Sequence, residues 1–506
     1  MIFLDTHTLR FWHRFWRQHP AFFLGISVLL GSFGIVWPIW AFLLYLPLLI
    51  TLPPASILPQ LALFCAVRLS FFGTYPSEPL QEKGVLGRAE FAIRSVHLSH
   101  THFGSRWVYR GELVRWDAEN GEKFYGLPCS FSLSSFSPRP TADSNYRFWA
   151  RLIQKRGSFL LKTHTHTHWE KVEGTWSLAE ARYHWKERVT HWIRQQIPSR
   201  PANHLLAAIV TGQLEDLELK GVFFRFGLLH LLAISGFHFT ILTTVLQWLL
   251  RPLPSEAGRL LLLFGLLSTY FFFLGPLPSV LRAWMMAILG MGGDWLHRPK
   301  KSLNFLGAAL VLNVLLDPFC WQNIGFQLSF VATLALLLFS TYFAKKLENL
   351  FPKRPLSTLL LMDRKEQHLY LLLGFFRQAL ALNCAVSLAV APILLYHFSQ
   401  FPWLSLLYNL FFPGCLALSF VLLVVAIATS WLPLVGPLFF ACSGYYTSWL
   451  LQLLSPLPTL QDPILYWSGI PFLGLIFYLM CLLAWGLHLK SDPKHQAFPV
   501  TDSLKS

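Results

Sequence analysis

Apolar runs follow one another along most of the chain, and many of them reach the length of about 20 residues that a bilayer requires. The first runs cover roughly 21–37, 39–52 and 55–73. Those after a polar region cover roughly 219–250, 259–275, 277–296, 303–316, 324–344, 368–395, 403–431, 433–455 and 470–488. The pattern predicts a polytopic α-helical membrane protein with about 10–12 transmembrane helices, some of them broken.

A polar region interrupts this pattern from about residue 80 to 175. Its short alternating runs, such as GELVRWDAE and GSFLLKTHTHTHW, are separated by clusters of Gly, Pro and Ser. Alternation with a period of two is typical of half-buried strands. The region therefore predicts a small β-barrel domain with about five strands.

The next segment, WSLAEARYHWKERVTHWIRQQI, has the period of an amphipathic helix and ends before Pro198. Trp185 and Val189 share one face, and Glu187 lies on the opposite face. We expect a helix that lies in the membrane interface, and packing on the β domain is a compatible alternative. The expected domains are N-terminal transmembrane helices (1–79), the β domain (80–175), the interfacial helix (176–200), a second transmembrane domain (201–490) and a short polar tail (491–506).

The composition agrees with this division, because 54% of the residues are hydrophobic and 13% are charged. Much of the net charge of +16 is explained by basic loops on one side of the membrane. If the spans alternate in direction, the basic loops around Arg251, Arg298, Lys345 and Lys490 share a side with Arg14, as the positive-inside rule requires. The β domain then faces the outside. No C-x-x-C pair occurs, so neither a disulfide framework nor a thiolate metal site is indicated.

Topology does not explain the basic residues of the β domain. Arginines alternate there with aromatic residues, which is typical of a surface that binds single-stranded nucleic acid by phosphate contacts and base stacking. The predicted contacts are Arg106, Trp107, Arg110, Arg115, Trp116 and Arg151. A general soluble surface can have the same composition, and this alternative stays open.

Polar residues inside an apolar run form a second candidate site. The stretch HLLAISGFHFT, residues 230–240, carries His230, Ser235, Gly236 and His238. A helix break at Ser235-Gly236 is tolerated only inside protein or beside a watery cavity, because unpaired backbone groups are costly in hydrocarbon. A helix that restarts there turns its positive end toward the cavity and favours an anion. Alternatively, Ser235 bonds to the preceding turn and Gly236 permits close helix packing.

Further polar side chains follow at a similar depth, namely Arg282, Asp317, Gln327 and Ser329. A charge at the centre of a bilayer costs about 2.5–3.5 kcal/mol even on a lenient scale, so Arg282 needs a partner. Asp317 is the predicted partner. Snorkelling of Arg282 to the interface is the alternative.

These blocks resemble the competence domain of the ComEC family of DNA-uptake channels. HLLAISGFHFTIL, RAWMMAILGM and LLDPFCWQNIGFQLSFVATLALLL occur in the family's order within about 206–345. The resemblance implies a channel in the bacterial cytoplasmic membrane that takes up single-stranded DNA during natural transformation. It also implies an OB-like outer domain and a channel domain at 201–490. Phe237 and Phe239 stand where family members carry Leu and Val.

The long family form ends in a metallo-β-lactamase-like domain, which we do not expect here because only about 18 residues follow the last apolar run. KTHTHTHW does not supply its metal site, because His168 and Trp169 stand where the H-x-H-x-D-H pattern needs Asp and His. No G-x-x-x-x-G-K-[ST] loop is present either. We therefore expect no enzyme activity, metal or cofactor. The expected partners are single-stranded DNA, membrane lipid, a DNA receptor, a separate nuclease and a cytoplasmic ATPase, helicase or single-strand-binding protein, and homo-oligomerisation stays open.

Two other functions compete with DNA uptake. An intramembrane enzyme would use His230 or His238 as a general base near Ser235, although no acid lies nearby in the sequence to orient the histidine. A transporter of small anions would need the same positive cavity but no outer nucleic-acid domain. Pore width separates these functions, because a DNA strand needs a wider passage than a small solute.

Overall fold

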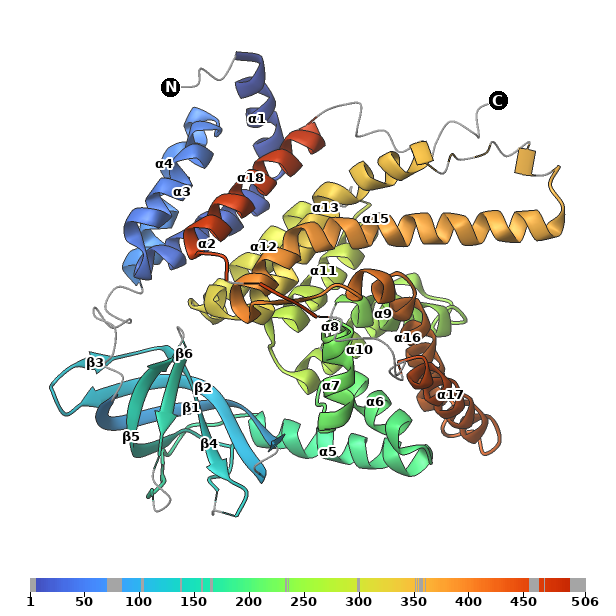
Figure 1. The fold of residues 1–506 in the computed structure, drawn as a ribbon. Helices are drawn as coiled ribbons and strands as arrows, with labels where there is room; N and C mark the ends of the chain where they lie inside the picture. Colours follow the sequence, from blue (N-terminus) through green and yellow to red (C-terminus); the bar gives the residue numbers. More distant parts are fainter. Residues whose placement is uncertain are drawn as a thin grey trace.

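The computed structural model describes residues 6–70, 84–101, 104–136, 139–155, 158–163, 167–232, 234, 236–297, 301–350, 352, 354, 358–359, 361–454, 464–467 and 469–491. It is mostly helical, with a β domain at one corner (Figure 1). The helices before the β domain are α1 (Thr6–Gln18), α2 (Pro20–Val36), α3 (Pro38–Ile50) and α4 (Pro54–Ser70). Those after it are α5 (Ala179–Gln196), α6 (Arg200–Thr211), α7 (Leu217–Arg225), α8 (Leu229–Leu232), α9 (Gly236–Leu249), α10 (Glu256–Leu274), α11 (Pro278–Trp295), α12 (Ser302–Leu316), η1 (Cys320–Gln322), α13 (Ile324–Leu350), α15 (Arg364–Phe398), α16 (Ser405–Ala428), α17 (Val435–Gln452) and α18 (Phe472–Ser491). A short strand pair, β8 (Gln400–Pro402) and β9 (Ile464–Tyr466), joins the segments that follow α15 and precede α18.

The β domain contains β1 (Val85–Thr101), β2 (Gly104–Ala118), β3 (Lys123–Phe124), β4 (Leu127–Ser134), β5 (Tyr146–Lys155), β6 (Ser158–Lys162) and β7 (Glu170–Lys171). Its pairings run β1–β2–β4–β6–β5 and return to β1. Within this path only the β4–β6 pair is parallel. Alternate side chains fill its core, among them Phe91, Tyr109, Leu113, Trp116, Phe131 and Phe148. Gly111 has no room for a side chain, because a Cβ there would overlap the carbonyl oxygen of Ala92.

Helix α5 connects the β domain to the other helices and packs against β1 and α6 (Figure 1). The sequence predicted a helix here, with Trp185 and Val189 on its apolar face. Lys186, Thr190 and Ile193 are buried, whereas Trp185 is 43% exposed. The Lys186 ammonium donates to a main-chain carbonyl at the end of α10, which gives this buried group a hydrogen-bond partner.

The other helices bring segments distant in sequence together. α1–α4 share one apolar core with α12, α13 and α18. α6–α9 pack with α16 and α17, and α9–α11 form a further core. The approach of α2 to α12 is so close that a Cβ on Gly307 would overlap the carbonyl oxygen of Ala21.

In the described residues, five helices are long and apolar enough to cross a membrane, namely α10, α13, α15, α16 and α18. A sixth results if Trp12–Gln18 and Pro20–Val36, which meet at 93°, form one span. These helices fit a multi-pass membrane protein, but their number is below the predicted total of about 10–12. The reason is local: the run at 219–250 is divided into α7, α8 and α9, and α12 has only 15 residues.

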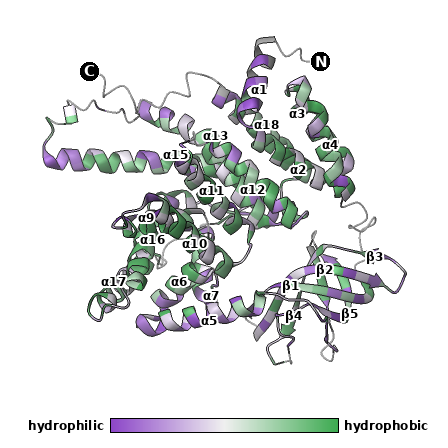
Figure 2. Cartoon of the chain, turned by 180° about the vertical axis from the view of Figure 1, so that it is seen from behind, coloured by the Kyte–Doolittle hydropathy of each residue, from purple (hydrophilic) through white to green (hydrophobic). Residues whose placement is uncertain are grey.

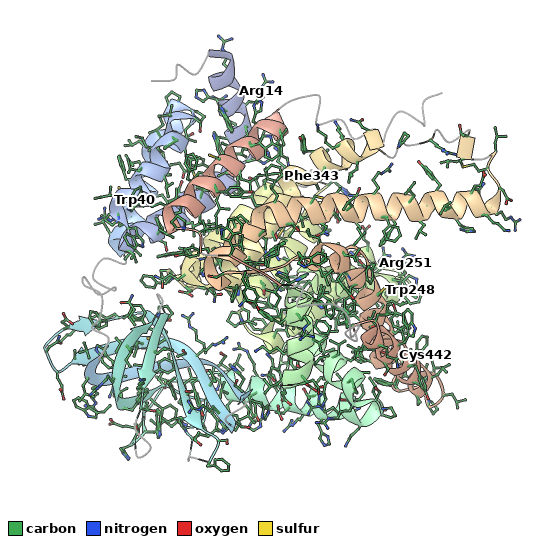
Figure 3. The ribbon with its side chains drawn as sticks, in the orientation of Figure 1. Arg14, Trp40, Trp248, Arg251, Phe343 and Cys442 are labelled. Carbon is green, nitrogen blue, oxygen red and sulfur yellow. The ribbon has the colours of Figure 1, made fainter. Side chains whose placement is uncertain are left out.

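Hydropathy follows the same division. Green, hydrophobic positions dominate most helices in Figure 2, whereas the β domain, α5 and the projecting end of α15 carry many polar positions. Arg14 on α1 lies at the edge of the molecule opposite the β domain (Figure 3). This is the arrangement that the positive-inside rule requires if the β domain faces the outside.

Candidate nucleic-acid interface

A cavity of about 1090 Å³ lies between the β domain, α5 and the nearby ends of α10, α11 and α12. We call it the outer cavity. The basic side chains among its lining residues are Arg94, Arg110, Arg182, Lys186 and Lys220, with His97 and His100. The acidic ones are Glu187, Glu215 and Asp317.

Strand register places one arginine and several small polar side chains on the β wall of the outer cavity. Ser95 of β1, Arg110 of β2 and Ser130 of β4 form one row across the three strands. Because side chains alternate along a strand, the neighbouring Tyr109 points into the core instead. Burial, followed by the charges of Arg110 and two lysines, lowers the pKa of His97 to about 4, so its ring is neutral at pH 7.

Helix α5 supplies the opposite wall. Arg182 Nε donates to the carbonyl oxygen of Phe272 (2.8 Å), and Lys186 Nζ donates to that of Leu274 (3.0 Å). Both cations therefore lie at the C-terminal end of α10, where helix carbonyls favour positive charge. Burial, together with the nearby Arg182 charge, lowers the pKa of Lys186 to about 8. These main-chain carbonyls hold the two side chains in place but carry no net charge. The positive charges of Arg182 and Lys186 therefore remain available to an anion.

Carboxylates neutralise other arginines of the β domain. Ion pairs join Arg88 to Glu170, Arg94 to Glu112, Arg115 to Asp117, Arg139 to Glu180 and Arg147 to Glu90. By contrast, no carboxylate of the described residues lies within ion-pair distance of Arg110, Arg182, Lys186 or Lys220. Glu215 in the acidic lining is itself paired with Arg194 at 2.8 Å. The outer cavity is therefore positively charged.

Both tryptophans that were predicted to stack on bases pack against other protein side chains instead. The prediction for Trp116 is wrong, because this side chain is 0% exposed in the β-domain core. Trp107 is half-buried, with the guanidinium of Arg139 at 4.3 Å from its ring centroid and the ring of Tyr183 edge-on at 5.3 Å. Composition placed both residues on the surface, but strand alternation turns them inward.

The predicted arginines divide into two groups. Arg110 lines the outer cavity, whereas Arg106, Arg115 and Arg151 are exposed and do not line it. Arg115 is also paired with Asp117 at 2.8 Å. Only Arg110 of the predicted set therefore belongs to the cavity.

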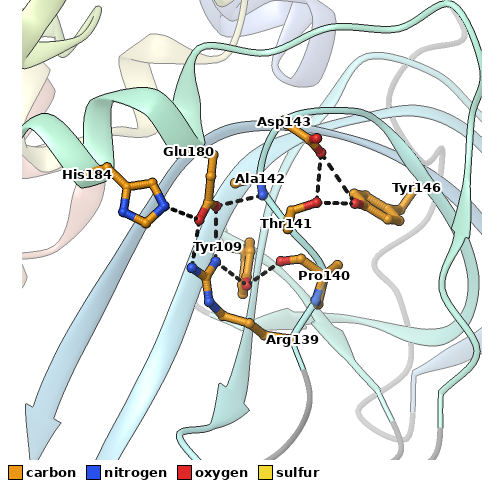
Figure 4. Close-up of polar contacts among 9 residues, drawn as sticks. All are labelled: Tyr109, Arg139, Pro140, Thr141, Ala142, Asp143, Tyr146, Glu180 and His184. Atoms are coloured by element: carbon orange, nitrogen blue, oxygen red, sulfur yellow. Dashed lines mark hydrogen bonds and ion pairs between the residues drawn. The ribbon is translucent and has the colours of Figure 1, made fainter.

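A polar network fixes the β domain to the start of α5 (Figure 4). The guanidinium of Arg139 donates to both carboxylate oxygens of Glu180, at 3.0 and 2.6 Å. The main-chain N–H of Ala142 also donates to this carboxylate (2.8 Å), and His184 Nε2 lies 3.1 Å from it. Tyr109 donates to the carbonyl oxygen of Pro140 in the same network. The wall formed by α5 is thereby held against the wall formed by β1 and β2.

The helix-break stretch lies in the helical part. Ser235 lies outside the described residues, and α8 ends before it whereas α9 begins at Gly236. A Cβ on Gly236 would lie 3.2 Å from Arg282 Nη2, and Arg282 Nη1 donates to the carbonyl oxygen of Ser329 (2.9 Å). The structure therefore brings together Gly236, Arg282 and Ser329 from three helices.

The predicted ion pair between Arg282 and Asp317 is not formed in the described part of the chain. Asp317 follows the last residue of α12 and accepts a hydrogen bond from the main-chain N–H of Phe319 (3.0 Å). It lines the outer cavity, where Arg94 donates to the carbonyl oxygen of the preceding Leu316 (3.1 Å). Chain connectivity puts the acid at a helix end facing the β domain, whereas Arg282 lies inside α11.

The remaining predicted residues do not join this group. His230 is exposed and its Nδ1 lies 3.1 Å from the carbonyl oxygen of Gly227. His238 is 1% exposed, with its ring edge-on to Phe420 at 5.6 Å. Gln327 accepts a hydrogen bond from His397 Nε2 (2.8 Å) and donates to a main-chain carbonyl. Neither histidine of the HLLAISGFHFT stretch lines the outer cavity.

Sequence reasoning missed several residues of the site. Arg182 and Lys186 are spaced i, i+4 on the predicted helix, which is a signal that both occupy one face. Arg139 and His397 carry no comparable local signal, because their partners lie far away in the sequence. Among the described residues no group of three His, Cys, Asp or Glu side chains could hold a metal ion, and His164 and His166 lie outside these residues.

The fold and the site define a helical protein with membrane-spanning character and a cationic cavity beneath a β domain. The family model for competence proteins matches residues 211–492, more than half of the chain, and the chain belongs to this family, the ComEC family. It is similar to ComE operon protein 3 of Bacillus subtilis (strain 168), with 29% identity over 263 residues. That alignment covers 50% of this chain and 30% of the relative. No solved structure matches the chain.

Proposed function

We propose that this chain forms a passage for single-stranded DNA across the bacterial cytoplasmic membrane during natural transformation. The observation that carries the proposal is the outer cavity, in which cations without carboxylate partners stand on both walls. Such a surface suits a polyanion, because each contacted phosphate releases condensed counterions. Membership of the competence-protein family supports the same role.

The β domain is proposed to deliver the strand to the cavity. A closed five-stranded ring with one parallel pair suits a Greek-key barrel of the OB type. OB domains bind oligonucleotides over their second and third strands, which correspond here to β2 and β4. Arg110 and Ser130 lie on these strands and line the outer cavity.

The chain is proposed to act as a channel rather than as an enzyme. Other proteins would then supply the steps that need chemical energy or hydrolysis: a DNA receptor, a separate nuclease and a cytoplasmic ATPase, helicase or single-strand-binding protein. Membrane lipid surrounds the spans, and assembly with further copies of the chain belongs to the same proposal.

Binding of a fluorescent oligothymidylate to the full chain in nanodiscs tests the proposal. We expect binding with little sequence preference and a logarithmic salt slope of about −0.7 for each phosphate contacted. Arg110→Gln should reduce the magnitude of this slope by about 0.7. The matched control is Arg88→Gln, because Arg88 is exposed, paired with Glu170 and absent from the cavity lining. Salt-independent binding, or equal losses in both variants, would contradict the proposal.

A further inference from the structure

Arg282 of α11 carries a buried positive charge that no carboxylate of the described residues neutralises. Its side chain is 7% exposed, and its neighbours Leu281 and Ala283 are buried too. Nη1 donates to the carbonyl oxygen of Ser329, whereas Nε has no hydrogen-bond partner. A guanidinium has five N–H donors, and a buried charge without a counter-ion is costly, especially inside a membrane. The surroundings of Arg282 therefore favour an anion.

Ser329 of α13 adds a second unsatisfied group beside this charge. Its Oγ is buried and has no hydrogen-bond partner. Its carbonyl oxygen already accepts from Arg282 Nη1 (2.9 Å) and Thr333 Oγ1 (2.9 Å). A buried hydroxyl without a partner is costly, and donation to an oxyanion would satisfy it.

The start of α9 faces the same guanidinium. A Cβ on Gly236 would lie 3.2 Å from Arg282 Nη2, so the charge lies against the first residue of a 14-residue helix. The N-terminal end of a helix is itself positive. Two positive groups this close repel each other, and an anion bound by both would relieve this repulsion.

Residues close in sequence to this cluster line the outer cavity. Leu232, the last residue of α8, and Leu281, the residue before Arg282, both line the outer cavity. A strand that leaves the cavity along α8 and α11 would meet Arg282 next.

We propose that Arg282, Ser329 Oγ and the first turn of α9 form a buried site for one phosphodiester group. The assignment of this group to the passing DNA strand rests on the proposed function. A phospholipid headgroup carries the same group, so the experiment compares the two sources.

The first test uses the purified full chain in maltoside detergent, which contains no phosphate. The probes are dimethyl phosphate, a short oligothymidylate and phosphatidylglycerol, and the readout is the midpoint of thermal unfolding. Dimethyl phosphate should stabilise the wild type, and Arg282→Gln should weaken this binding about 10-fold or more, because a charge-assisted hydrogen bond is lost. Ser329→Ala should weaken it less, and Arg282→Lys should retain part of it. Arg251→Gln, which changes an arginine just beyond the opposite end of α9 (Figure 3), should bind like the wild type.

Each outcome decides between the assignments. Equal stabilisation of the wild type and Arg282→Gln by dimethyl phosphate would overturn the site, even if oligothymidylate binding with its salt slope persisted and upheld the proposed function. Arg282-dependent binding of dimethyl phosphate without any binding of oligothymidylate would uphold the site and overturn the proposed function. Arg282-dependent stabilisation by phosphatidylglycerol alone would overturn the assignment to DNA. If Arg282→Gln is poorly folded, Arg282→Lys and Ser329→Ala carry the same comparison.

Discussion

The guanidinium of Arg139 and the carboxylate of Glu180 form a two-pronged ion pair that joins the β domain to the first turn of α5. The same guanidinium covers the ring of Trp107 at 4.3 Å. Since residues of both the β domain and α5 line the outer cavity, this pair helps to hold its walls together. The relationship leads to a stability prediction that depends on pH.

Glu180→Gln should destabilise the protein by about 1–3 kcal/mol at pH 7, because a partly buried arginine loses its charged partner. Burial would raise the pKa of Glu180, but the hydrogen bonds from Arg139 and Ala142 lower it below the ordinary value of 4.5. A carboxyl with a lowered pKa stabilises the fold above its unfolded pKa, and this contribution disappears as the pH falls through the folded value. Thermal unfolding from about pH 6 to about pH 3 should therefore show a steeper loss for the wild type than for Glu180→Gln. Glu119→Gln, at an exposed position, is the control, and identical pH profiles for Glu180→Gln and the wild type would contradict the prediction.

Trp116→Ala should destabilise the β domain by about 3–5 kcal/mol, because it leaves a large cavity in the core. Trp149→Ala, at a site that is 54% exposed, should change the stability by less than about 0.5 kcal/mol. Chemical denaturation followed by tryptophan fluorescence measures both. If Trp116→Ala were stable but bound DNA more weakly, the result would contradict this prediction. It would instead support base stacking on Trp116, which the burial of this residue excludes.

The affinity for oligothymidylate should fall as the pH rises through about 8, the pKa of Lys186. Above this pH the buried ammonium loses its proton and one cation of the outer cavity is lost. Lys186→Arg keeps its charge throughout this range, so its affinity should remain constant between about pH 7 and about pH 9. Anisotropy titrations at fixed ionic strength provide the measurement, and a parallel decline in both proteins would show that another group titrates.

The outward orientation of the β domain can be tested by labelling one cysteine that is added to the wild-type chain. Cys129 is unsuitable as a reporter, because its side chain is only 5% exposed. Ser132 lies on the exposed face of β4, so a cysteine introduced at this position is a suitable reporter. Ser132→Cys should add labelling by a membrane-impermeant maleimide applied from outside the cytoplasmic membrane, relative to the wild type. Added labelling only after access from the cytoplasmic side would reverse the predicted topology.

Gly236→Leu should abolish transformation at normal protein abundance, because the new side chain would press against Arg282 Nη2 and displace the guanidinium. A passage should tolerate His230→Gln or His238→Gln, whereas an intramembrane enzyme with a histidine base would lose activity as fully as Gly236→Leu. Transformation frequency, DNA uptake and protein abundance are scored in parallel. Normal transformation by Gly236→Leu would mean that the glycine serves only helix packing.

The sequence by itself was sufficient for the features that depend on local pattern. The long apolar runs predicted apolar helices, and period-two alternation predicted the β domain, because hydrophobic spacing reports the geometry of each segment. The HLLAISGFHFT blocks were sufficient for the family, which the competence-protein match confirms.

Only the tertiary structure decided which side chains share a site. Trp116 and Arg110 have the same local composition, yet strand register buries the first and places the second in the outer cavity. Arg282 lies against Gly236 rather than being paired with Asp317, because helix packing sets which distant residues meet. Local periodicity predicts which face of a helix or strand a residue occupies. The residue that it contacts comes from another part of the chain, and only the packed fold brings the two together.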